Sequence, residues 1–167
     1  MSDLPYRRCV GIALVNRDGE VFVGRRKPKG DEEILAAHAW QMPQGGIDAG
    51  EAPLEAAKRE LWEETSVRSI ALLAELPEWL SYDLPLDARR RWSGRYRGQT
   101  QKWFLFRLVG DEAEINVRDS ADGVHRAEFT EWRWERFERV PDLVVPFKRK
   151  VYEAVARAFA PLSHAPG

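Results

Sequence analysis

The sequence has little cysteine, no long hydrophobic run and almost no net charge. Cys9 is the only cysteine among 167 residues, so no internal disulfide can form and a zinc site built on cysteine is not expected. No apolar run reaches transmembrane length, and the N-terminus lacks the apolar stretch of a signal peptide, so we expect no membrane partner and a cytoplasmic location. Because the formal net charge is −1, any attraction for phosphates must come from a local basic cluster.

The remaining composition is that of a globular protein, with 44% hydrophobic and 32% charged residues. We expect one domain over residues 1–162 and a disordered tail over residues 163–167. Short apolar or alternating runs predict strands at residues 10–15, 20–24, 70–74, 103–109 and 129–134. Helical spacing predicts helices at residues 53–66 and 146–159, with a polar loop at 27–38 and irregular chain at 76–86. This order predicts an α/β or α+β fold in which helices cover a mixed sheet.

Three glutamates share one face of the first predicted helix. Glu60, Glu63 and Glu64 stand at positions i, i+3 and i+4, about one turn apart. Like charges at this spacing destabilise a helix, whereas a bound cation would turn the repulsion into attraction. Mg²⁺ binds through a few carboxylates and substrate phosphates. A solvated acidic face is the alternative interpretation, but the glycine-containing loop directly before the helix favours a ligand site.

The segment from Gly45 to Val67 resembles the Nudix box. Gly45 is followed by five residues, Glu51, seven residues, and then Arg59-Glu60-Leu61-Trp62-Glu63-Glu64-Thr65-Ser66-Val67. The family pattern has glycine at the position of Ser66, where it ends the helix in a left-handed conformation. The resemblance implies the Nudix fold, a mixed β-sheet sandwiched between α-helices, and metal-dependent hydrolysis of a nucleoside diphosphate linked to another group.

The same resemblance assigns roles within the box. It implies that Glu60, Glu63 and Glu64 bind divalent metal ions, Mg²⁺ or Mn²⁺, together with the carbonyl of Gly45. We expect Arg59 to form a salt bridge with Glu51 that joins the loop to the helix, and we group Arg59 with the catalytic residues.

The rest of the chain resembles the bacterial RNA pyrophosphohydrolases, a branch that overlaps with the dinucleoside polyphosphate hydrolases. The likeness extends from about Tyr6 to Phe159. It is carried by Tyr6-Arg7 and by residues 40–46, 101–104, 113–116 and 147–152. It implies conversion of 5′-triphosphate RNA to 5′-monophosphate RNA with release of pyrophosphate or two phosphates, which initiates mRNA decay. The loop at 27–38 is longer than in the shorter members and lies next to the expected site.

Three residues are candidates for binding the phosphate chain. Arg26 and Lys102 would contact the phosphates, and Tyr82 would add a hydroxyl donor, because such contacts neutralise the charge that builds during phosphoryl transfer. A surface arginine at a strand end is the alternative for Arg26.

Four residues are candidates for binding a base, because RNA ends are typically read by stacking on aromatic or arginine planes. Arg7 and Phe147 would sandwich the base, with Val145 and Lys148 beside them. Phe147 could instead anchor the last helix in the core. The basic segment at 89–102 could follow an RNA backbone, although a solvated loop is the favoured interpretation.

Glu128 stands where the branch has a fourth acidic ligand or a general base. Either Glu64 or Glu128 would take the proton from the attacking water, with Glu63 also in the catalytic group. A hydrolase of diadenosine tetraphosphate or pentaphosphate is the nearest alternative function, and a non-catalytic nucleotide- or RNA-binding module is a remote one. We expect a monomer and no DNA partner.

Overall fold

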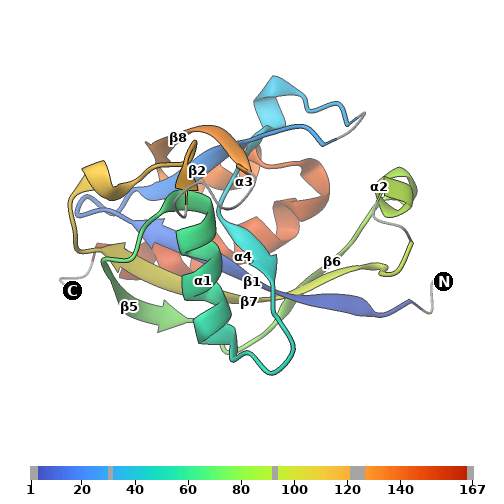
Figure 1. Cartoon of the computed structure of the whole chain (residues 1–167), viewed down its shortest axis with the longest axis horizontal. Coiled ribbons are helices and arrows are strands. Elements are labelled where there is room, and N and C mark those ends of the chain that lie inside the picture. Colours follow the sequence, from blue (N-terminus) through green and yellow to red (C-terminus); the bar gives the residue numbers. More distant parts are fainter. Residues whose placement is uncertain (1–3, 30–31, 92–93, 121–126, 165–167) are drawn as a thin grey trace.

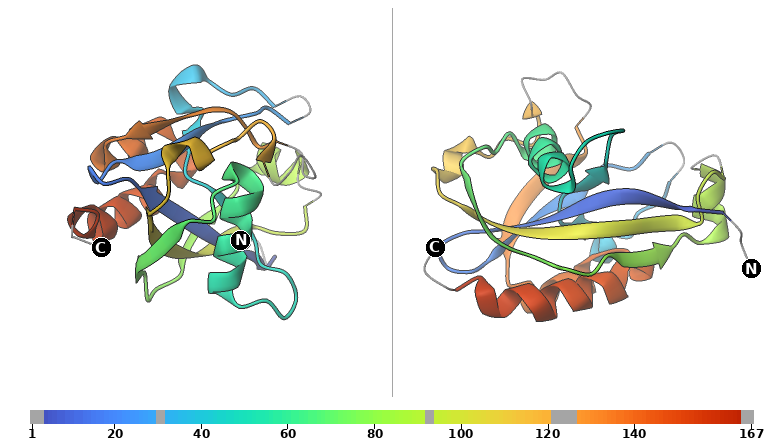
Figure 2. Two further views of the ribbon diagram at one scale, coloured as in Figure 1. Left: turned by 60° about the vertical axis from the view of Figure 1, so that its left-hand side comes forward. Right: turned by 90° about the horizontal axis from the view of Figure 1, so that it is seen from below.

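The computed structural model of the chain describes residues 4–29, 32–91, 94–120 and 127–164. Within these residues, eight strands form one mixed sheet, and the two longest helices lie on opposite faces of it (Figures 1 and 2). The strands are β1 (Tyr6–Val15), β2 (Val21–Arg26), β3 (Trp40–Gln41), β4 (Gln44–Gly46), β5 (Ile70–Glu75), β6 (Leu80–Asp83), β7 (Gly98–Leu108) and β8 (Phe129–Glu135). The helices are α1 (Pro53–Thr65), α2 (Leu86–Arg91), α3 (Val140–Leu143) and α4 (Arg149–Phe159). The predicted mixed sheet between helices is confirmed.

The centre of the sheet is a long parallel pair. β1 runs beside β7 from Tyr6 opposite Gly98 to Val15 opposite Arg107. The other pairings are antiparallel: β2 and β4 pair with β1, β5 and β6 with β7, and β3 and β8 with β2. Because β2 and β4 both pair along the same strand, β1, the chain around β4 is held against the centre of the molecule.

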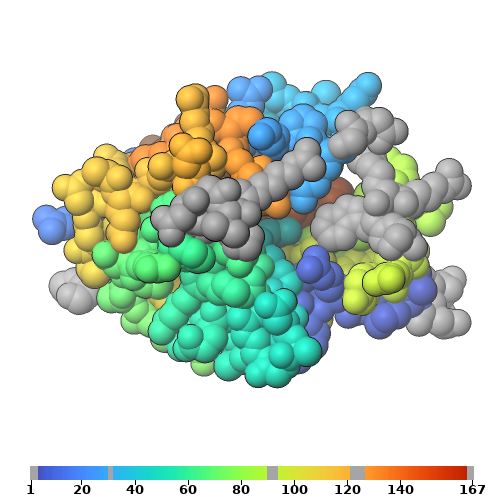
Figure 3. Space-filling view, in the orientation of Figure 1, coloured from blue at the N-terminus to red at the C-terminus, as the bar shows by residue number. Residues whose placement is uncertain are grey.

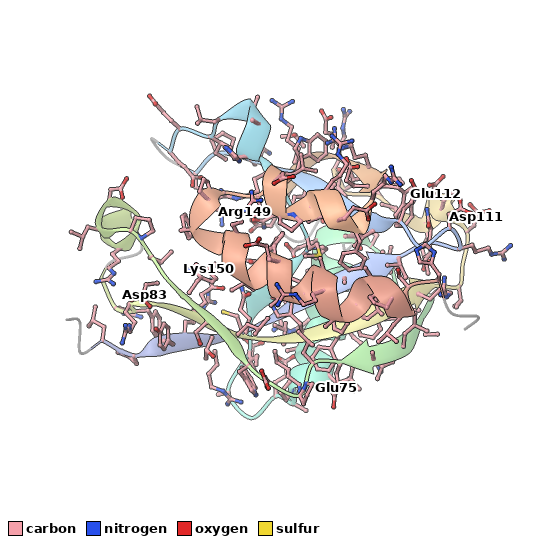
Figure 4. All side chains as sticks on the ribbon, turned by 180° about the vertical axis from the view of Figure 1, so that it is seen from behind. Glu75, Asp83, Asp111, Glu112, Arg149 and Lys150 are labelled. Atoms are coloured by element: carbon pink, nitrogen blue, oxygen red, sulfur yellow. The ribbon has the colours of Figure 1, made fainter. Side chains whose placement is uncertain are left out.

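Two hydrophobic cores lie on the two faces of the sheet. Successive residues of a strand point to opposite faces, so β7 places Trp103 in the core that contains Tyr152 of α4, and Phe104 in the core that contains Leu61 of α1. Close packing also explains Gly11, because a Cβ there would lie 2.3 Å from Cε2 of Trp103. Burial of α1 and α4 on these cores fixes both helices relative to the sheet. Figure 4 shows α4 across the back of the sheet, with Arg149 and Lys150 at its start.

The structure differs from the predicted elements in several places. The segment predicted to be irregular contains β6, which pairs with the first half of β7, so its order comes from a partner distant in sequence. A 3₁₀ turn at Pro146–Lys148 precedes α4, whereas the sequence predicted one continuous helix. Ser163, the first residue of the predicted tail, is buried, and its carbonyl accepts a hydrogen bond from Nη2 of Arg107 at 2.9 Å. Residues 165–167 lie outside the described part.

Among the described residues, no helix combines the length and apolar character that a membrane span requires.

Candidate active site

A polar pocket of about 280 Å³ brings residues from distant parts of the chain together. Figure 3 shows the face that carries α1 and the segment after β2. The pocket is lined by Arg7, Arg26, Lys29, Gln41, Gln44, Gly45, Gly46, Glu60, Glu64, Gln99, Glu128 and Lys148. Carboxylates and cationic side chains therefore share one cavity, which is the chemistry needed to hold a divalent cation together with an anionic ligand.

The helix α1 supplies the acidic wall. Pro53 occupies the first turn, where its missing N–H removes no hydrogen bond, and Ala57 and Leu61 fix the helix on the core. Glu60 and Glu64 are one turn apart and both line the pocket. Glu63 lies outside the lining residues, and its Oε2 accepts a hydrogen bond from Nη1 of Arg59 at 3.2 Å.

Burial shifts the protonation of the two pocket carboxyls. Glu64 is only 4% exposed, and its Oε2 is buried without a hydrogen-bond partner. Burial, with the charges of Glu60 and Glu128, raises the pKa of Glu64 well above its usual value. Burial also raises the pKa of Glu60 to about 7, against the lowering effect of Arg59. A positive ion in the pocket would offset both penalties.

Gly45 brings the backbone against this acidic wall. A Cβ at Gly45 would lie 2.0 Å from Cδ of Glu60 and 2.1 Å from its Oε2. Only glycine allows the β4 backbone to approach the carboxylate so closely. The position of Gly45 next to Glu60 is compatible with its predicted role as a carbonyl ligand.

Arg59 holds the loop before α1 in place. Its Nε and Nη2 donate to the two carboxylate oxygens of Glu51 at 2.8 and 2.9 Å, which confirms the predicted salt bridge. Nη2 also donates to the carbonyl of Gly46 at 2.8 Å, and Nη1 donates to Oε1 of Glu60 at 2.9 Å. The hydrogen bonds from Arg59 to Glu51 lower the pKa of the Glu51 carboxyl to about 2. Arg59 therefore acts through other residues and is a positioning residue.

The acidic donor set suits a hard divalent cation. A bound cation would give the Oε2 atom of Glu64 a partner, and it would offset the burial and neighbouring negative charge that raise the pKa values of Glu60 and Glu64. Within the described ranges, no three His, Cys, Asp or Glu side chains already stand grouped as a metal site. Glu60 and Glu63 instead turn toward Arg59, because its guanidinium is the nearest positive charge.

Cationic side chains also line the pocket. Arg7 lies over Gly46, where an added Cβ would be 2.3 Å from its Nη2. Lys148 is only 6% exposed, and its Nζ donates to Oε1 of Gln41 at 3.2 Å. Burial, together with the charge of Arg26, lowers the pKa of Lys148 to about 7. A polyphosphate in this pocket would stabilise the charged form of Lys148.

A second pocket of about 270 Å³ adjoins the first, and Arg26 and Lys148 line both. Tyr82, Val145 and Phe147 belong to the second pocket, where the rings of Tyr82 and Phe147 lie 5.6 Å apart at 42°. Arg7 lines only the first pocket and Phe147 only the second. The half-buried ring of Phe147 packs against the α4-side core and also lines this pocket.

Lys102 lies outside both pockets, contrary to its predicted contact with phosphates. Its Nζ donates to the carbonyl of Leu76. Side chains alternate along β7, so Gln99 and Gln101 face Gln44 on the pocket side while Lys102 points to the other face.

The basic segment at 89–102, which begins within α2, is partly neutralised. Arg89 and Arg97 pair with Asp83 at 3.7 and 2.9 Å. Trp92, which the sequence suggested as part of an RNA path, lies outside the described residues.

Five pocket residues were not predicted as site residues from the sequence: Lys29, Gln41, Gln44, Gly46 and Gln99. Gln41 and Gln44 lie within four residues of Gly45, so proximity to the box was an available signal. Gln99 reaches the pocket through the pairing of β1 with β7, and Lys29 lies in a loop without periodicity.

Comparisons with known proteins identify the family of the chain. The chain matches the NUDIX domain family over residues 5–155. A protein of Azorhizobium caulinodans named RNA pyrophosphohydrolase is 57% identical over 165 residues, which cover 98% of each chain. A protein of the same name from a Bradyrhizobium species is 59% identical over 163 residues, covering 97% of this chain and 96% of that one.

Solved structures share the fold at low sequence identity. The E. coli dihydroneopterin triphosphate pyrophosphohydrolase is 18% identical, with a TM-score of 0.65 and coverage of 92% of this chain and 98% of that one. A C. elegans Ap4A hydrolase in a binary complex is 15% identical, with a TM-score of 0.58 and coverage of 92% and 98%. These two likenesses concern the fold alone. With the family match along most of the chain and relatives more than half identical over nearly all of it, the chain belongs to the Nudix family of hydrolases, which generally use divalent metal ions.

Proposed function

We propose that the protein is a cytoplasmic, monomeric RNA pyrophosphohydrolase that converts 5′-triphosphate RNA to 5′-monophosphate RNA and thereby initiates mRNA decay. The observation that carries the proposal is one pocket lined both by the carboxylates of Glu60, Glu64 and Glu128 and by cationic side chains. A triphosphate with a divalent cation complements both kinds of charge. The relatives from Azorhizobium caulinodans and Bradyrhizobium, which carry the name RNA pyrophosphohydrolase, support this substrate over others.

Mg²⁺ or Mn²⁺ would be held by Glu60, Glu63, Glu64 and Glu128 and by the carbonyl of Gly45. When bound, the ion supplies positive charge that offsets the charge of the phosphates and makes water a stronger acid. Arg59 donates to Glu60 and Glu63 at 2.9 and 3.2 Å, so it restricts the positions of both carboxylates.

Glu64 is the favoured proton acceptor, with Glu128 as the alternative. The Oε2 atom of Glu64 has no hydrogen-bond partner, so it is free to take a proton from water that attacks phosphorus. The attack breaks a phosphoanhydride bond, and the leaving phosphate group departs with that bond's electron pair. Arg26 and Lys148, which line the same pocket, would offset the negative charge of the leaving phosphate group.

The adjoining pocket would hold a base. Tyr82, Val145 and Phe147 provide an apolar and aromatic lining, and Arg26 and Lys148 connect it to the phosphate region. Stacking on an aromatic ring suits an unpaired RNA base. We propose no DNA partner.

Hydrolysis of a dinucleoside polyphosphate is the second candidate, because the same aromatic pocket accepts adenine. A non-catalytic binding module would need a disabled acidic cluster, and Ser66 is the only departure within the box. The test compares initial rates on 5′-triphosphate RNA and diadenosine tetraphosphate at matched low concentrations with Mg²⁺, using Glu64→Gln as the control.

We expect a large preference for RNA and at least a tenfold loss of turnover in the Glu64→Gln variant. A preference for the dinucleotide would reject the RNA assignment while leaving the glutamate roles intact. Turnover on neither substrate would favour the binding module.

A further inference from the structure

Lys29 is an additional cation at the acidic wall of the pocket. It follows β2 and lines the same cavity as Glu60, Glu64 and Glu128. Its Nζ lies 3.3 Å from Oε2 of Glu128. The side chains of Lys29 and Glu128 are 59% and 41% exposed, so solvent screens the pair and its contribution is small.

The backbone near Lys29 is anchored beside Glu128. The N–H of Lys27 donates to the carbonyl of Glu128 at 3.0 Å, and Arg26 at the end of β2 pairs with Phe129 of β8, the residue after Glu128. Arg26 also donates from Nη2 to both carboxylate oxygens of Glu32 at 3.1 Å. The main chain therefore stays at the rim of the pocket while the flexible stem of Lys29 can change partner.

We propose that Lys29 is a substrate-binding residue whose ammonium group exchanges Glu128 for the phosphate chain when a divalent cation binds Glu128. The inference rests on the proposed function for the identity of the phosphate ligand. A cation at the Glu128 oxygens repels the Lys29 ammonium, and a polyphosphate offers it a new anionic partner in the same cavity. Lys29 therefore competes with the metal ion in the free protein and assists the substrate in the complex.

Lys29→Met tests both parts of the proposal, the competition with the metal ion and the contact with the phosphate chain. Lys27→Met is its matched control. Lys27 is exposed, lines neither pocket, and makes its contact with Glu128 through a backbone N–H that methionine retains. Both variants remove one positive charge from the same loop, so long-range effects of net charge cancel in the comparison.

The first measurement is calorimetric titration of the metal-free protein with Mn²⁺ alone. We expect the Kd of Lys29→Met to be roughly twofold to fivefold below that of Lys27→Met, because Glu128 is released from its ion pair. Equal Kd values in the two variants would overturn the competition between Lys29 and the metal ion.

The second measurement is KM for 5′-triphosphate RNA at saturating Mg²⁺. We expect roughly a tenfold higher KM in Lys29→Met and no comparable change in Lys27→Met. An unchanged KM in Lys29→Met would overturn the contact with phosphate. If the wild-type protein hydrolyses no triphosphate RNA, the proposed function fails, whereas the Mn²⁺ titration still decides the pairing of Lys29 with Glu128.

Discussion

Two buried charged side chains, Glu64 and Lys148, determine the chemistry of the pocket at the residue scale. Each is almost fully buried, and burial favours the neutral form of each: it raises the pKa of Glu64 and lowers that of Lys148 to about 7. In its charged form, neither side chain stabilises the metal-free folded protein. Their retention in the pocket is consistent with ligands that restore both charges, a cation for Glu64 and an anion for Lys148.

Replacing Lys148 with methionine should raise the free energy of unfolding at neutral pH. The pKa of Lys148 falls from 10.5 to about 7 on folding, so between these values the unfolded state binds more protons. The neutral form of Lys148 stabilises the folded protein fully above the unfolded pKa. This stability is lost as pH falls through the folded pKa. The gain from Lys148→Met should therefore be largest near pH 7 and shrink toward pH 10.5.

Urea unfolding of the wild type and Lys148→Met at several pH values between these two pKa values measures the effect. A difference that does not vary with pH would contradict the shifted pKa and would point to packing alone.

At the element scale, the end of α1 depends on an unusual residue. Ser66 follows α1 with φ 69° and ψ 3°, and it is the only non-glycine residue with positive φ among the described residues. Its N–H donates to the carbonyl of Trp62 at 2.8 Å, and its Oγ donates to the carbonyl of Asn116 at 3.1 Å. The N–H of Asn116 donates in turn to the carbonyl of Thr65 at 2.9 Å. The left-handed end of the helix is therefore present without glycine.

A pair of substitutions separates the strain at Ser66 from its hydrogen bond. Ser66→Ala keeps the Cβ in the left-handed region and loses the bond to Asn116, so it should destabilise the protein by about 1 kcal/mol. Ser66→Gly loses the same bond but removes a steric cost of about 1–2 kcal/mol, so it should be at least as stable as the wild type.

Chemical denaturation of the two variants and the wild type tests this order. If alanine proved as stable as glycine at position 66, the positive φ would carry no cost and the argument would fail. Activity should survive in both variants, because Ser66 lines neither pocket.

At the scale of the whole molecule, the site lies where separate parts of the fold meet. α1 contains the pocket glutamates Glu60 and Glu64, and β1 contains Arg7. Lys29 lies after β2, Glu128 lies directly before β8, and Lys148 lies directly before α4. Ligands in the pocket therefore contact elements on both faces of the sheet. A ligand that binds only the folded protein adds its binding free energy to the stability of the whole domain.

Mg²⁺ or Mn²⁺ should accordingly raise the melting temperature of the wild-type protein. At a free concentration 100 times the Kd, the gain in unfolding free energy is about 2.7 kcal/mol. The increase should be much smaller in Glu64→Gln, which removes one anionic donor from the pocket. Scanning calorimetry with and without a chelator measures both proteins, and an equal rise in the two would exclude Glu64 from the metal ligands.

Local sequence patterns determined the acidic helix and the Nudix box. The spacing of Glu60, Glu63 and Glu64 requires only helical periodicity, and the partnership of Arg59 with Glu51 follows from the loop and helix being adjacent in the chain. The main strands were likewise predictable, because each carries its own apolar or alternating pattern. The family resemblance added the roles of Gly45 and Glu128, which periodicity alone does not assign.

Only the tertiary structure decided which remaining side chains reach the pocket. Lys102 and Gln99 both lie in β7, but strand alternation and the pairing with β1 place Gln99 in the pocket and Lys102 against Leu76. β6 is a strand because it pairs with β7, and Lys29 lies at the pocket because its loop contacts Glu128. These outcomes depend on contacts between residues far apart in the chain, and such contacts leave no local periodic pattern in the sequence.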